Sequence, residues 1–375
     1  MEFHINKDPL LKALTRIQTV VERRNTMPIL GNALLETGKG ILTVSATNLE
    51  VSLRTVCEAE IGDSGSLAVN AKTLFEIVRE LPHGAIHIRS EANNRLKLTS
   101  GQAKFTISGF PGENFPEIPE ASGDKRHIFE REELLDMINK THFAMSYDET
   151  RFTLNGVFFQ LAPGGESGGP AKVKMVATDT HRLAMIEQNI EECTVSDTAE
   201  IIIPKKAVFE IKKILEEEDE KVELVIGDTH IQFIKPDITL ISKLVQGQFP
   251  DYRRVIPPNN KLRLTMDRAQ LDVVVKRMSV LSHEKSRGIR MSITEKSMLL
   301  SSNNPEQEAG EEPIEVIYEG GEPITIGFNA RYLREILSAM DGERVRFLLQ
   351  NDEAPSLVFD PDKDNALFVL MPMRV

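Results

Sequence analysis

NAKTLFEIVREL, at residues Asn70–Leu81, is the first of three related blocks in this chain, and the expected architecture follows from them. The second block is Pro204–Leu215, PKKAVFEIKKIL, and the third is Asn329–Met340, NARYLREILSAM. Each has apolar residues at three- and four-residue intervals, which predicts an amphipathic helix. Apolar, strand-like runs flank every block. The repetition indicates three tandem copies of one domain, which we assign to residues 1–125, 126–255 and 256–375.

The polar face of the predicted helix is basic at matching positions. Lys72 and Arg79 lie two helical turns apart in the first block, and Lys206 and Lys213 occupy the same positions in the second. Arg331 keeps the first of these positions in the third block. A basic helix face is often only solvated, but a solvated face could equally have drifted to glutamate after duplication. The pattern favours a function for this face.

Length and composition fit a globular protein. The chain has 375 residues, of which 41% are hydrophobic and 27% charged. No apolar run is long enough to cross a bilayer, and the first residues, MEFHINKDPLLK, lack the pattern of a signal peptide. Cys57 and Cys193 lie in different repeats without a partner spacing, which argues against disulfides and thiolate metal sites. We expect a cytoplasmic protein that does not associate with a membrane.

The net charge of −12 argues, taken alone, against tight binding of nucleic acid, because that affinity comes largely from neutralised phosphates. The charge is unevenly distributed, however. Acidic residues gather at Glu216–Glu220 and again at Glu306, Glu308, Glu311 and Glu312. Basic helices within an acidic exterior are compatible with DNA held inside a ring, and equally with no DNA at all.

Each repeat opens with a strand and a first helix. In repeat one, Asp8 can cap this helix, and Leu10, Leu11, Leu14 and Ile17 form its apolar stripe. The equivalent helices are expected at Arg131–Lys140 and Arg268–Met278, with Leu11, Leu135 and Leu271 in corresponding positions. Strands fill most of the rest, including one at Phe152–Leu161. Helices and strands do not alternate regularly, so we predict an α+β fold with two helices packed on antiparallel sheets in every repeat.

Two serine motifs resemble nucleophile segments of hydrolases. Ser64 lies in GDSG, but only His4 precedes it, whereas the chymotrypsin-like pattern needs an earlier His and Asp. Ser167 lies in GESGG, between two predicted strands and not between a strand and a helix. There is also no Walker A motif, GxGxxG or HExxH. The sequence therefore predicts no cofactor, no metal and no catalytic residue at these motifs.

One polar cluster leaves two interpretations open. Asp179, His181 and Arg182 follow a predicted strand and could serve as the acid, base and anion clamp of a cytosolic hydrolase. Their counterparts are Thr47-Asn48 and Asn303-Asn304, which follow equivalent strands. Asp and Asn at such junctions most simply bond the backbone of their own turn.

Several segments together resemble the bacterial sliding clamps, the family of the beta subunit of DNA polymerase III. They are Pro28–Asn32, Leu154–Gly156, Ala177–Ala184, Ser242–Pro257, Asn303–Ala309 and the terminal MPMRV. The resemblance covers essentially the whole chain. It implies a DNA-clamp fold and a head-to-tail homodimer that forms a six-domain ring around double-stranded DNA, with helices lining the hole. The implied function is that of a processivity factor without a catalytic site.

The resemblance also implies partners. They are the alpha subunit of DNA polymerase III, the clamp loader, other DNA polymerases, and repair and ligation proteins, which share one peptide cleft. Arg24 matches a DNA-contacting position of the family, and the helix faces extend the candidate DNA contacts to Lys72, Arg79, Lys205, Lys206, Lys212, Lys213, Lys276 and Arg331. Such contacts to phosphates position a protein without reading sequence.

The implied peptide cleft lies between the second and third domains. Its residues are Leu154, Thr178, His181, Arg182, Leu183, Pro250, Arg254, Val255, Ser356, Val369, Met371, Pro372, Met373 and Arg374. Methionines adapt to several partners, and we expect Arg182, Arg254 and Arg374 to form a polar rim. Thr180 replaces a glycine of the family pattern and Ala354 replaces a bulkier residue, which puts the detailed shape of the cleft in question.

The implied dimer joint uses Phe105 and Ile107 on an edge strand of domain one, meeting Val280 and Leu281 of the partner chain. An exposed apolar edge otherwise invites aggregation, so a second subunit is a physical use for it. Two alternatives to a clamp remain at this point: the hydrolase based on Asp179, His181 and Arg182, and a monomeric repeat scaffold that does not bind DNA.

Overall fold

The computed structural model describes residues 1–21, 27–120, 126–164, 169–190, 195–217, 221–283 and 286–374. Several residues discussed above lie outside these ranges, namely Arg24, Ser167, Cys193 and residues 218–220. By its contacts the chain forms two compact units, one of Met1–Arg131 with Phe209–Leu244 and one of Glu132–Val208 with Val245–Val375.

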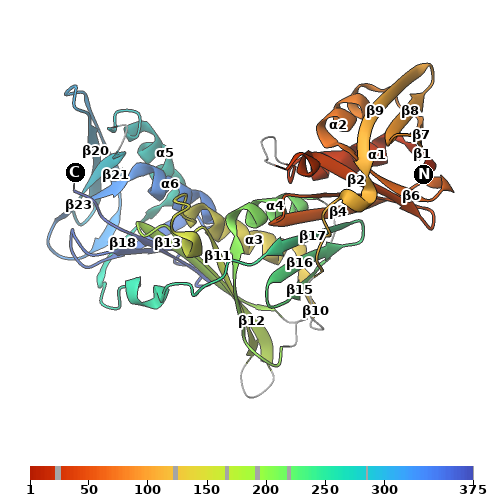
Figure 1. The fold of residues 1–375 in the computed structure, drawn as a ribbon. Helices are drawn as coiled ribbons and strands as arrows, with labels where there is room; N and C mark the ends of the chain where they lie inside the picture. Colours follow the sequence, from red (N-terminus) through yellow and green to blue (C-terminus); the bar gives the residue numbers. More distant parts are fainter. Residues whose placement is uncertain are drawn as a thin grey trace. The chain divides into compact units, whose positions relative to one another are not determined.

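Helices and strands alternate irregularly in all three repeats (Figure 1). Repeat one contains β1 (Glu2–Asn6), α1 (Lys7–Ile17), η1 (Pro28–Gly31), β2 (Asn32–Gly38), β3 (Ile41–Thr47), β4 (Val51–Glu58), β5 (Glu60–Asp63), β6 (Gly65–Asn70), α2 (Ala71–Glu80), β7 (Ala85–Glu91), β8 (Arg95–Ser100), β9 (Ala103–Pro111) and η2 (Gly112–Asn114). Repeat two contains β10 (Arg126–Glu130), α3 (Arg131–Thr141), η3 (His142–Ala144), η4 (Phe152–Leu154), β11 (Gly156–Gly164), β12 (Gly169–Thr178), β13 (Arg182–Ile190), β14 (Ala199–Pro204), α4 (Lys205–Leu215), β15 (Lys221–Ile226), β16 (His230–Lys235), β17 (Ile238–Lys243) and η5 (Tyr252–Val255). Repeat three contains β18 (Leu262–Asp267), α5 (Arg268–Met278), β19 (Gly288–Ile293), β20 (Ser297–Asn303), β21 (Ala309–Glu315), β22 (Ile317–Glu319), β23 (Ile324–Asn329), α6 (Ala330–Ala339), β24 (Arg344–Leu349), β25 (Ser356–Phe359) and β26 (Ala366–Leu370).

The three predicted block helices are confirmed as α2, α4 and α6. Two begin after an asparagine whose side chain caps the first turn. Asn70 Oδ1 accepts from the Thr73 amide at 2.9 Å, and Asn329 Oδ1 accepts from the Arg331 amide at 3.0 Å. The apolar faces are buried, as Leu74 and Leu333 show with no exposed area.

The first helices differ from expectation in two details. Asp8 does not cap α1, because the helix begins at Lys7 and Asp8 lies within its first turn; the preceding residue, Asn6, makes no side-chain cap. The expected correspondence of Leu11 with Leu135 is confirmed, but the alignment of Leu271 with them is wrong by one position. Buried residues place Leu10, Leu134 and Leu271 in equivalent positions, because the apolar stripe of α1 faces inward through Leu10, Ala13, Leu14 and Ile17. The predicted strand at Phe152–Leu161 is likewise replaced by the short helix η4 followed by β11.

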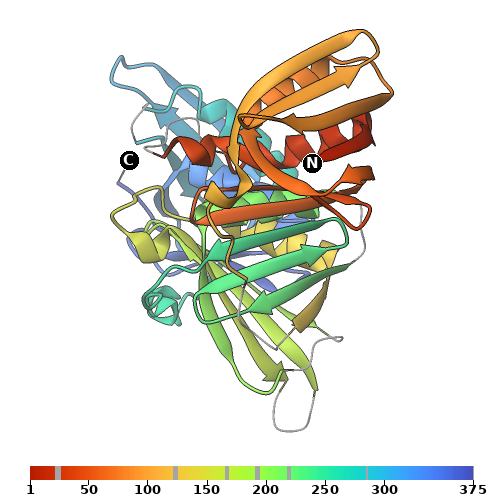
Figure 2. The same cartoon turned by 45° about the vertical axis from the view of Figure 1, so that its right-hand side comes forward.

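The sheets cross the predicted repeat boundaries. In the first unit, a thirteen-stranded sheet runs in the order β10-β15-β16-β17-β4-β3-β2-β6-β9-β8-β7-β1-β5 among the described residues. The antiparallel pair β17 and β4 joins strands of repeats two and one, with Leu240 opposite Leu53. Helices α1 and α2 pack against each other, and α1 also contacts β3 and β4. Figure 2 shows the orange helix α2 behind the neighbouring orange strands.

The second unit repeats this arrangement. Its nine-stranded sheet has the order β14-β11-β12-β13-β26-β25-β24-β18-β22, and a four-stranded sheet has the order β21-β20-β19-β23. The antiparallel pair β13 and β26 joins repeats two and three, with Leu183 opposite Val369. Each compact unit therefore contains one whole repeat and part of repeat two. The α+β fold of tandem antiparallel domains is confirmed, whereas the boundaries at residues 125 and 255 stay predictions. None of the helices described is long and apolar enough to cross a membrane.

Candidate functional site

The polar residues that end equivalent strands bond the backbone of their own turns. Asn48 Oδ1 accepts from the amides of Glu50 at 3.0 Å and Val51 at 2.8 Å. Asp179 Oδ1 accepts from the amides of His181 at 2.9 Å and Arg182 at 3.0 Å. Asn304 Oδ1 accepts from the Glu308 amide at 2.9 Å. This repeated geometry confirms the turn interpretation of Asp179.

Arg182 is buried, with only 2% of its side chain exposed. Its Nε lies 3.1 Å from Asp179 Oδ2, and its Nη1 is paired with Glu335. The guanidinium also lies 4.3 Å from the centre of the Tyr332 ring. These partners hold it inside the second unit, so the expected role of Arg182 in an exposed polar rim is wrong. It is equally unavailable as the anion clamp of a hydrolase.

The other described side chains form neither a metal site nor a reactive thiol. No set of three or more His, Cys, Asp or Glu side chains among the described residues is arranged to hold a metal ion. Burial raises the pKa of the Cys57 thiol to about 11, so this thiol stays protonated at neutral pH.

An apolar cluster contains two of the predicted cleft residues, Leu183 and Val369. Leu183 and Val369 pack with four other buried residues, Phe158, Val176, Ile202 and Tyr252. The segment that leads to η5 covers this cluster, because the ring of Phe249 stacks on that of Phe158 with 5.3 Å between the ring centres. Leu154 is buried in η4, and Ser356 lies opposite Leu370 on the neighbouring strand.

Two exposed apolar side chains, Val255 and Met371, closely follow members of this cluster in the chain. Val255 of η5 is 48% exposed and Met371, which follows β26, is 38% exposed. The aromatic ring of Phe152 is 60% exposed in η4, which holds the predicted cleft residue Leu154. Sequence reasoning missed Phe152 because it assigned this residue to a strand. Pro250 and His181 are also exposed, and Thr178 is half-buried.

The carboxy-terminal tail is fixed at two points. The Met371 amide donates to His181 O at 3.0 Å, and the Met373 amide donates to Gly327 O at 2.9 Å. Pro372, Met373 and Arg374 line an open pocket together with Arg290, Gly327 and Glu353. Two of the three predicted rim arginines are solvent-facing: Arg254 pairs with Asp251 at 3.0 Å, and Arg374 pairs with Glu353 at 3.7 Å.

Several of the predicted basic residues of the helices are exposed and pair with a carboxylate of their own helix. Lys72 lies 3.6 Å from Glu76, and Arg331 lies 3.0 Å from Glu335. Arg79 pairs with Glu80 and Lys213 with Glu210, both at 2.9 Å. Lys276 is exposed, and Lys206 and Lys212 are half-buried. Lys72–Glu76 and Arg79–Glu80, in which both side chains are exposed, are weak pairs, so another anion can replace the carboxylate there.

Lys205 is held differently. Its Nζ lies 3.1 Å from the centre of the Tyr147 ring, and burial lowers the pKa of the ammonium group. Tyr147 is 66% exposed and was not singled out from the sequence, because it lies outside the repeated blocks. The pair presents an aromatic face beside a cation.

Of the residues predicted for a dimer joint, Phe105 and Ile107 lie on β9, whereas Val280 and Leu281 lie in the turn after α5. Residues 103–108 of β9 pair with β8, while only Gly109–Pro111 pair with β6. Phe105 is 38% exposed there, but Ile107 is 8% exposed and packs within its own repeat. Val280 is 79% exposed at the end of α5. Leu281 contacts β21, where its Cδ1 lies 3.3 Å from the position that a Cβ on Gly310 would take.

Comparison with known proteins gives a consistent result over the whole chain. Three family models match: the N-terminal domain of the DNA polymerase III beta subunit at residues 1–119, its central domain at 129–251 and its C-terminal domain at 253–374. The beta sliding clamp of Pseudomonas aeruginosa is 37% identical, and the alignment covers 100% of both chains. A crystal structure of the Caulobacter crescentus beta sliding clamp is similar with a TM-score of 0.94, 37% identity and 100% coverage of both chains. A structure of the Pseudomonas aeruginosa clamp bound to griselimycin is similar with a TM-score of 0.93 and 37% identity, again over 100% of both chains.

Proposed function

This chain belongs to the DNA polymerase III beta-subunit family and is a DNA sliding clamp, and from that premise we propose which of its surfaces contact DNA, a second chain and partner peptides. A clamp acts as a processivity factor without a catalytic site of its own. The hydrolase and DNA-independent scaffold alternatives are therefore wrong. The single observation that carries the assignment is the match of all three domains in order along the chain.

We propose that duplex DNA replaces the intrahelical carboxylates at the basic helix faces. The contacts are Lys72, Arg79, Lys205, Lys206, Lys212, Lys213, Lys276 and Arg331, with Arg24 added from the resemblance although it lies outside the described residues. The exposed pairs Lys72–Glu76 and Arg79–Glu80 support this, because such weak pairs hold the cations in place and are replaced by another anion at little energetic cost. Weak, sequence-blind contacts to phosphates suit a protein that slides.

We propose that two chains close a head-to-tail ring by pairing β9 of one with β21 of the other. The support is the repeat pattern within the chain. β4 and β13 are the third strands after the first helices of repeats one and two, and they pair with β17 and β26 of the following repeat. β21 is the equivalent strand of repeat three and ends its sheet, while residues 103–108 of β9 are open on one side. A heterologous contact that closes after two chains gives a ring.

The same pattern predicts the register of this joint. The hairpins close at Ser100 opposite Ala103 and at Lys235 opposite Ile238, so Phe105 is equivalent to Leu240. Gly310 is equivalent to Leu53, which lies opposite Leu240. Phe105 of one chain then lies opposite Gly310 of the other, where the missing side chain leaves room for the ring against Leu281. Lys104 falls opposite Glu311, a favourable cross-strand charge pair.

We propose that the apolar cluster around Leu183 and Val369, with exposed Val255 and Met371 beside it, takes apolar anchors of partner peptides. Flexible methionines suit a surface that serves several partners in turn. The partners are the polymerase alpha subunit, the clamp loader, other DNA polymerases, and repair and ligation proteins. Arg254 and Arg374 remain as the polar rim, because Arg182 is buried.

The decisive experiment measures retention on nicked circular DNA after loading by a clamp loader and removal of free protein. The same complex is then cut once to create ends. Protein that stays on the circle and leaves the linear molecule is held topologically, as a clamp requires. Equal retention on circle and line, or retention on neither with a competent loader, would contradict the proposed ring.

A further inference from the structure

A buried cation joins repeat one to repeat two inside the chain. Arg16 of α1 has only 7% of its side chain exposed. Its Nε donates to Glu217 Oε1 at 3.0 Å, and its Nη1 donates to Asp237 Oδ2 at 2.8 Å and to Thr55 Oγ1 at 3.2 Å. Glu217 follows α4 and Asp237 lies between β16 and β17, so both carboxylates come from repeat two. Burial alone would lower the pKa of Arg16, but the two carboxylates raise it.

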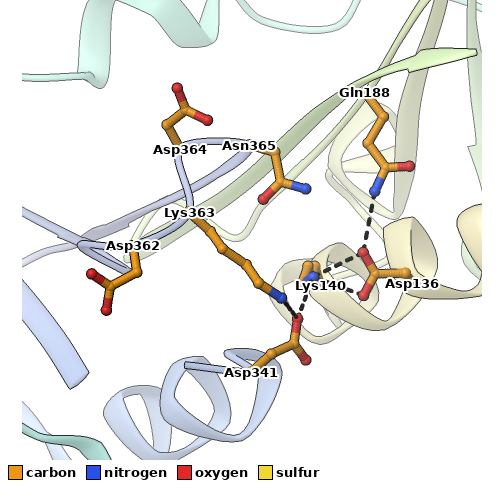
Figure 3. Close-up of a pocket in the computed structure, with 8 residues that line it drawn as sticks. All are labelled: Asp136, Lys140, Gln188, Asp341, Asp362, Lys363, Asp364 and Asn365. Carbon is orange, nitrogen blue, oxygen red and sulfur yellow. Dashed lines mark hydrogen bonds and ion pairs between the residues drawn. The ribbon is translucent and has the colours of Figure 1, made fainter. Parts of the chain in front are cut away.

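An equivalent cation joins repeat two to repeat three. Lys140 of α3 also has 7% of its side chain exposed, and its Nζ lies 2.7 Å from Asp136 Oδ1 and 2.8 Å from Asp341 Oδ2 (Figure 3). Asp341 follows α6 of repeat three, as Glu217 follows α4 of repeat two. Counted from the equivalent Leu10 and Leu134, Arg16 and Lys140 hold the same position of the first helix. We call this arrangement, a first-helix cation bonded to a carboxylate of the next repeat, the latch.

In repeat three, the cation at this position pairs with a carboxylate of its own repeat. Counted from Leu271, it is Arg277, whose side chain is 52% exposed. Arg277 pairs with Glu312 of β21, and this hydrogen bond raises the pKa of the guanidinium. The ladders place Glu312 in the position that Thr55 holds in β4, which Arg16 also contacts. Repeat three thus supplies an acid internally where repeat one has a neutral threonine.

In repeat one, no carboxylate occupies the positions equivalent to the acids that bond the first-helix cation. The residues equivalent to Glu217 and Asp237 are His83 and Gln102, and the residue equivalent to Asp341 is Pro82. His83 is instead directed to Asp8 of its own repeat, with 3.2 Å between Nδ1 and Oδ1. A partner chain that brought Arg277 to this end of repeat one would find no acid at the three latch positions.

We propose that the two joints inside each chain are held by the latch, while the joint between chains is built without it, so that the ring separates there and stays closed elsewhere. The inference rests on the proposed head-to-tail ring. In this proposal Arg16 and Lys140 position neighbouring repeats against each other. Glu312 pairs with Arg277 inside repeat three, so Arg277 is not available to bond the other chain.

The test rebuilds the missing latch by combining His83→Glu, Gln102→Asp and Glu312→Thr. Exchange of subunits between two fluorescently labelled populations measures how often the joint opens. We expect exchange at least about tenfold slower than in the parent protein, because a buried charge-assisted hydrogen bond is gained. Adding Arg277→Thr should abolish the gain. Glu312→Thr alone is the matched control and should not slow exchange.

Three outcomes contradict the proposal in different ways. Unchanged exchange in a folded, dimeric triple variant overturns the latch and leaves the ring standing. A parent protein that is monomeric at all concentrations overturns the proposed ring and the latch with it. A complementary variant, Lys140→Met, guards against misfolding of the triple variant. In Lys140→Met, the exchange of backbone amide hydrogens with solvent should become faster in α3 and in the residues after α6. Unchanged amide hydrogen exchange would also overturn the latch.

Discussion

Lys140 Nζ lies 2.8 Å from Asp341 Oδ2, although the two residues are 201 positions apart in the chain. The contact ties the first helix of repeat two to the end of the second helix of repeat three. Arg16 and Glu217 form the corresponding contact between repeats one and two, with 3.0 Å between Nε and Oε1. Equivalent side chains thus stabilise both internal joints of a triplicated protein.

Replacing Lys140 by Met should lower the free energy of unfolding by about 1–3 kcal/mol, because Asp136 and Asp341 lose a buried charge-assisted partner. Both aspartates are partly exposed, which keeps the loss below that of a fully buried pair. Thermal or denaturant unfolding measures it. Lys363→Met is the control, since this lysine is 54% exposed and lies 3.3 Å from Asp341. Equal losses in the two variants would contradict the assigned role.

Acid should weaken the joint of repeats one and two. The hydrogen bond from Arg16 lowers the pKa of Glu217 below its ordinary value of 4.5. A carboxyl with a lowered folded pKa contributes stability that is present above its unfolded pKa and lost as the pH falls through its folded pKa. The midpoint temperature of thermal unfolding should therefore decrease as the pH is lowered below about 4.5. This decrease should be smaller in Arg16→Met. The same acid dependence in both proteins would argue against this pair.

Thr180→Gly should stabilise the turn after β12 by about 0.5–1 kcal/mol. Thr180 has φ of 76°, a left-handed conformation that a β-branched residue adopts with strain. Glycine relieves the strain but gains freedom in the unfolded chain, and it loses the 3.0 Å hydrogen bond from Arg151, which keeps the net gain small. Chemical denaturation measures the effect. Leu49→Gly, at φ of 73°, should change stability in the same direction.

Replacing Lys72 and Lys206 by Glu should weaken loading onto DNA and reduce the salt dependence of DNA binding, because fewer phosphates are neutralised. Lys213 is a poor choice for this test, since its partner Glu210 is only 8% exposed and would be left beside a second carboxylate. Loading on primed DNA at several salt concentrations gives the measurement. Lys39→Glu with Lys261→Glu, exposed lysines outside the helices, is the charge-matched control. Equal effects would mean that only net charge matters.

Deleting residues 371–375 should abolish binding of a polymerase-derived peptide and leave the dimer intact. The deletion removes Met371 from beside the apolar cluster and breaks the backbone bonds to His181 and Gly327, while β26 keeps its pairing with β13. Fluorescence polarisation of a labelled peptide and the mass in solution report the two properties. Lys261→Ala, at an exposed position outside the proposed cleft, is the matched control and should leave both properties unchanged. Undiminished peptide affinity after the deletion would place the cleft elsewhere.

Local patterns in the sequence determined the repeated architecture. The three blocks form helices because apolar side chains recur along one face, and Asn70 and Asn329 begin two of them by capping free amides. Asn48 and Asp179 were also predictable, since their bonding partners lie two and three residues away. These interactions need no distant residue, so the sequence alone contains them.

Only the tertiary structure decided which side chains are available. Arg182 was expected on an exposed rim, yet Glu335 and Tyr332 from repeat three enclose it. Lys140 carries the same positive charge as the exposed lysines of the helices and is nevertheless buried by a residue 201 positions away. The pairing of β17 with β4 and of β13 with β26 likewise joins strands from different repeats. Burial and strand pairing depend on partners that are distant in the chain. The local pattern of apolar residues does not identify those partners.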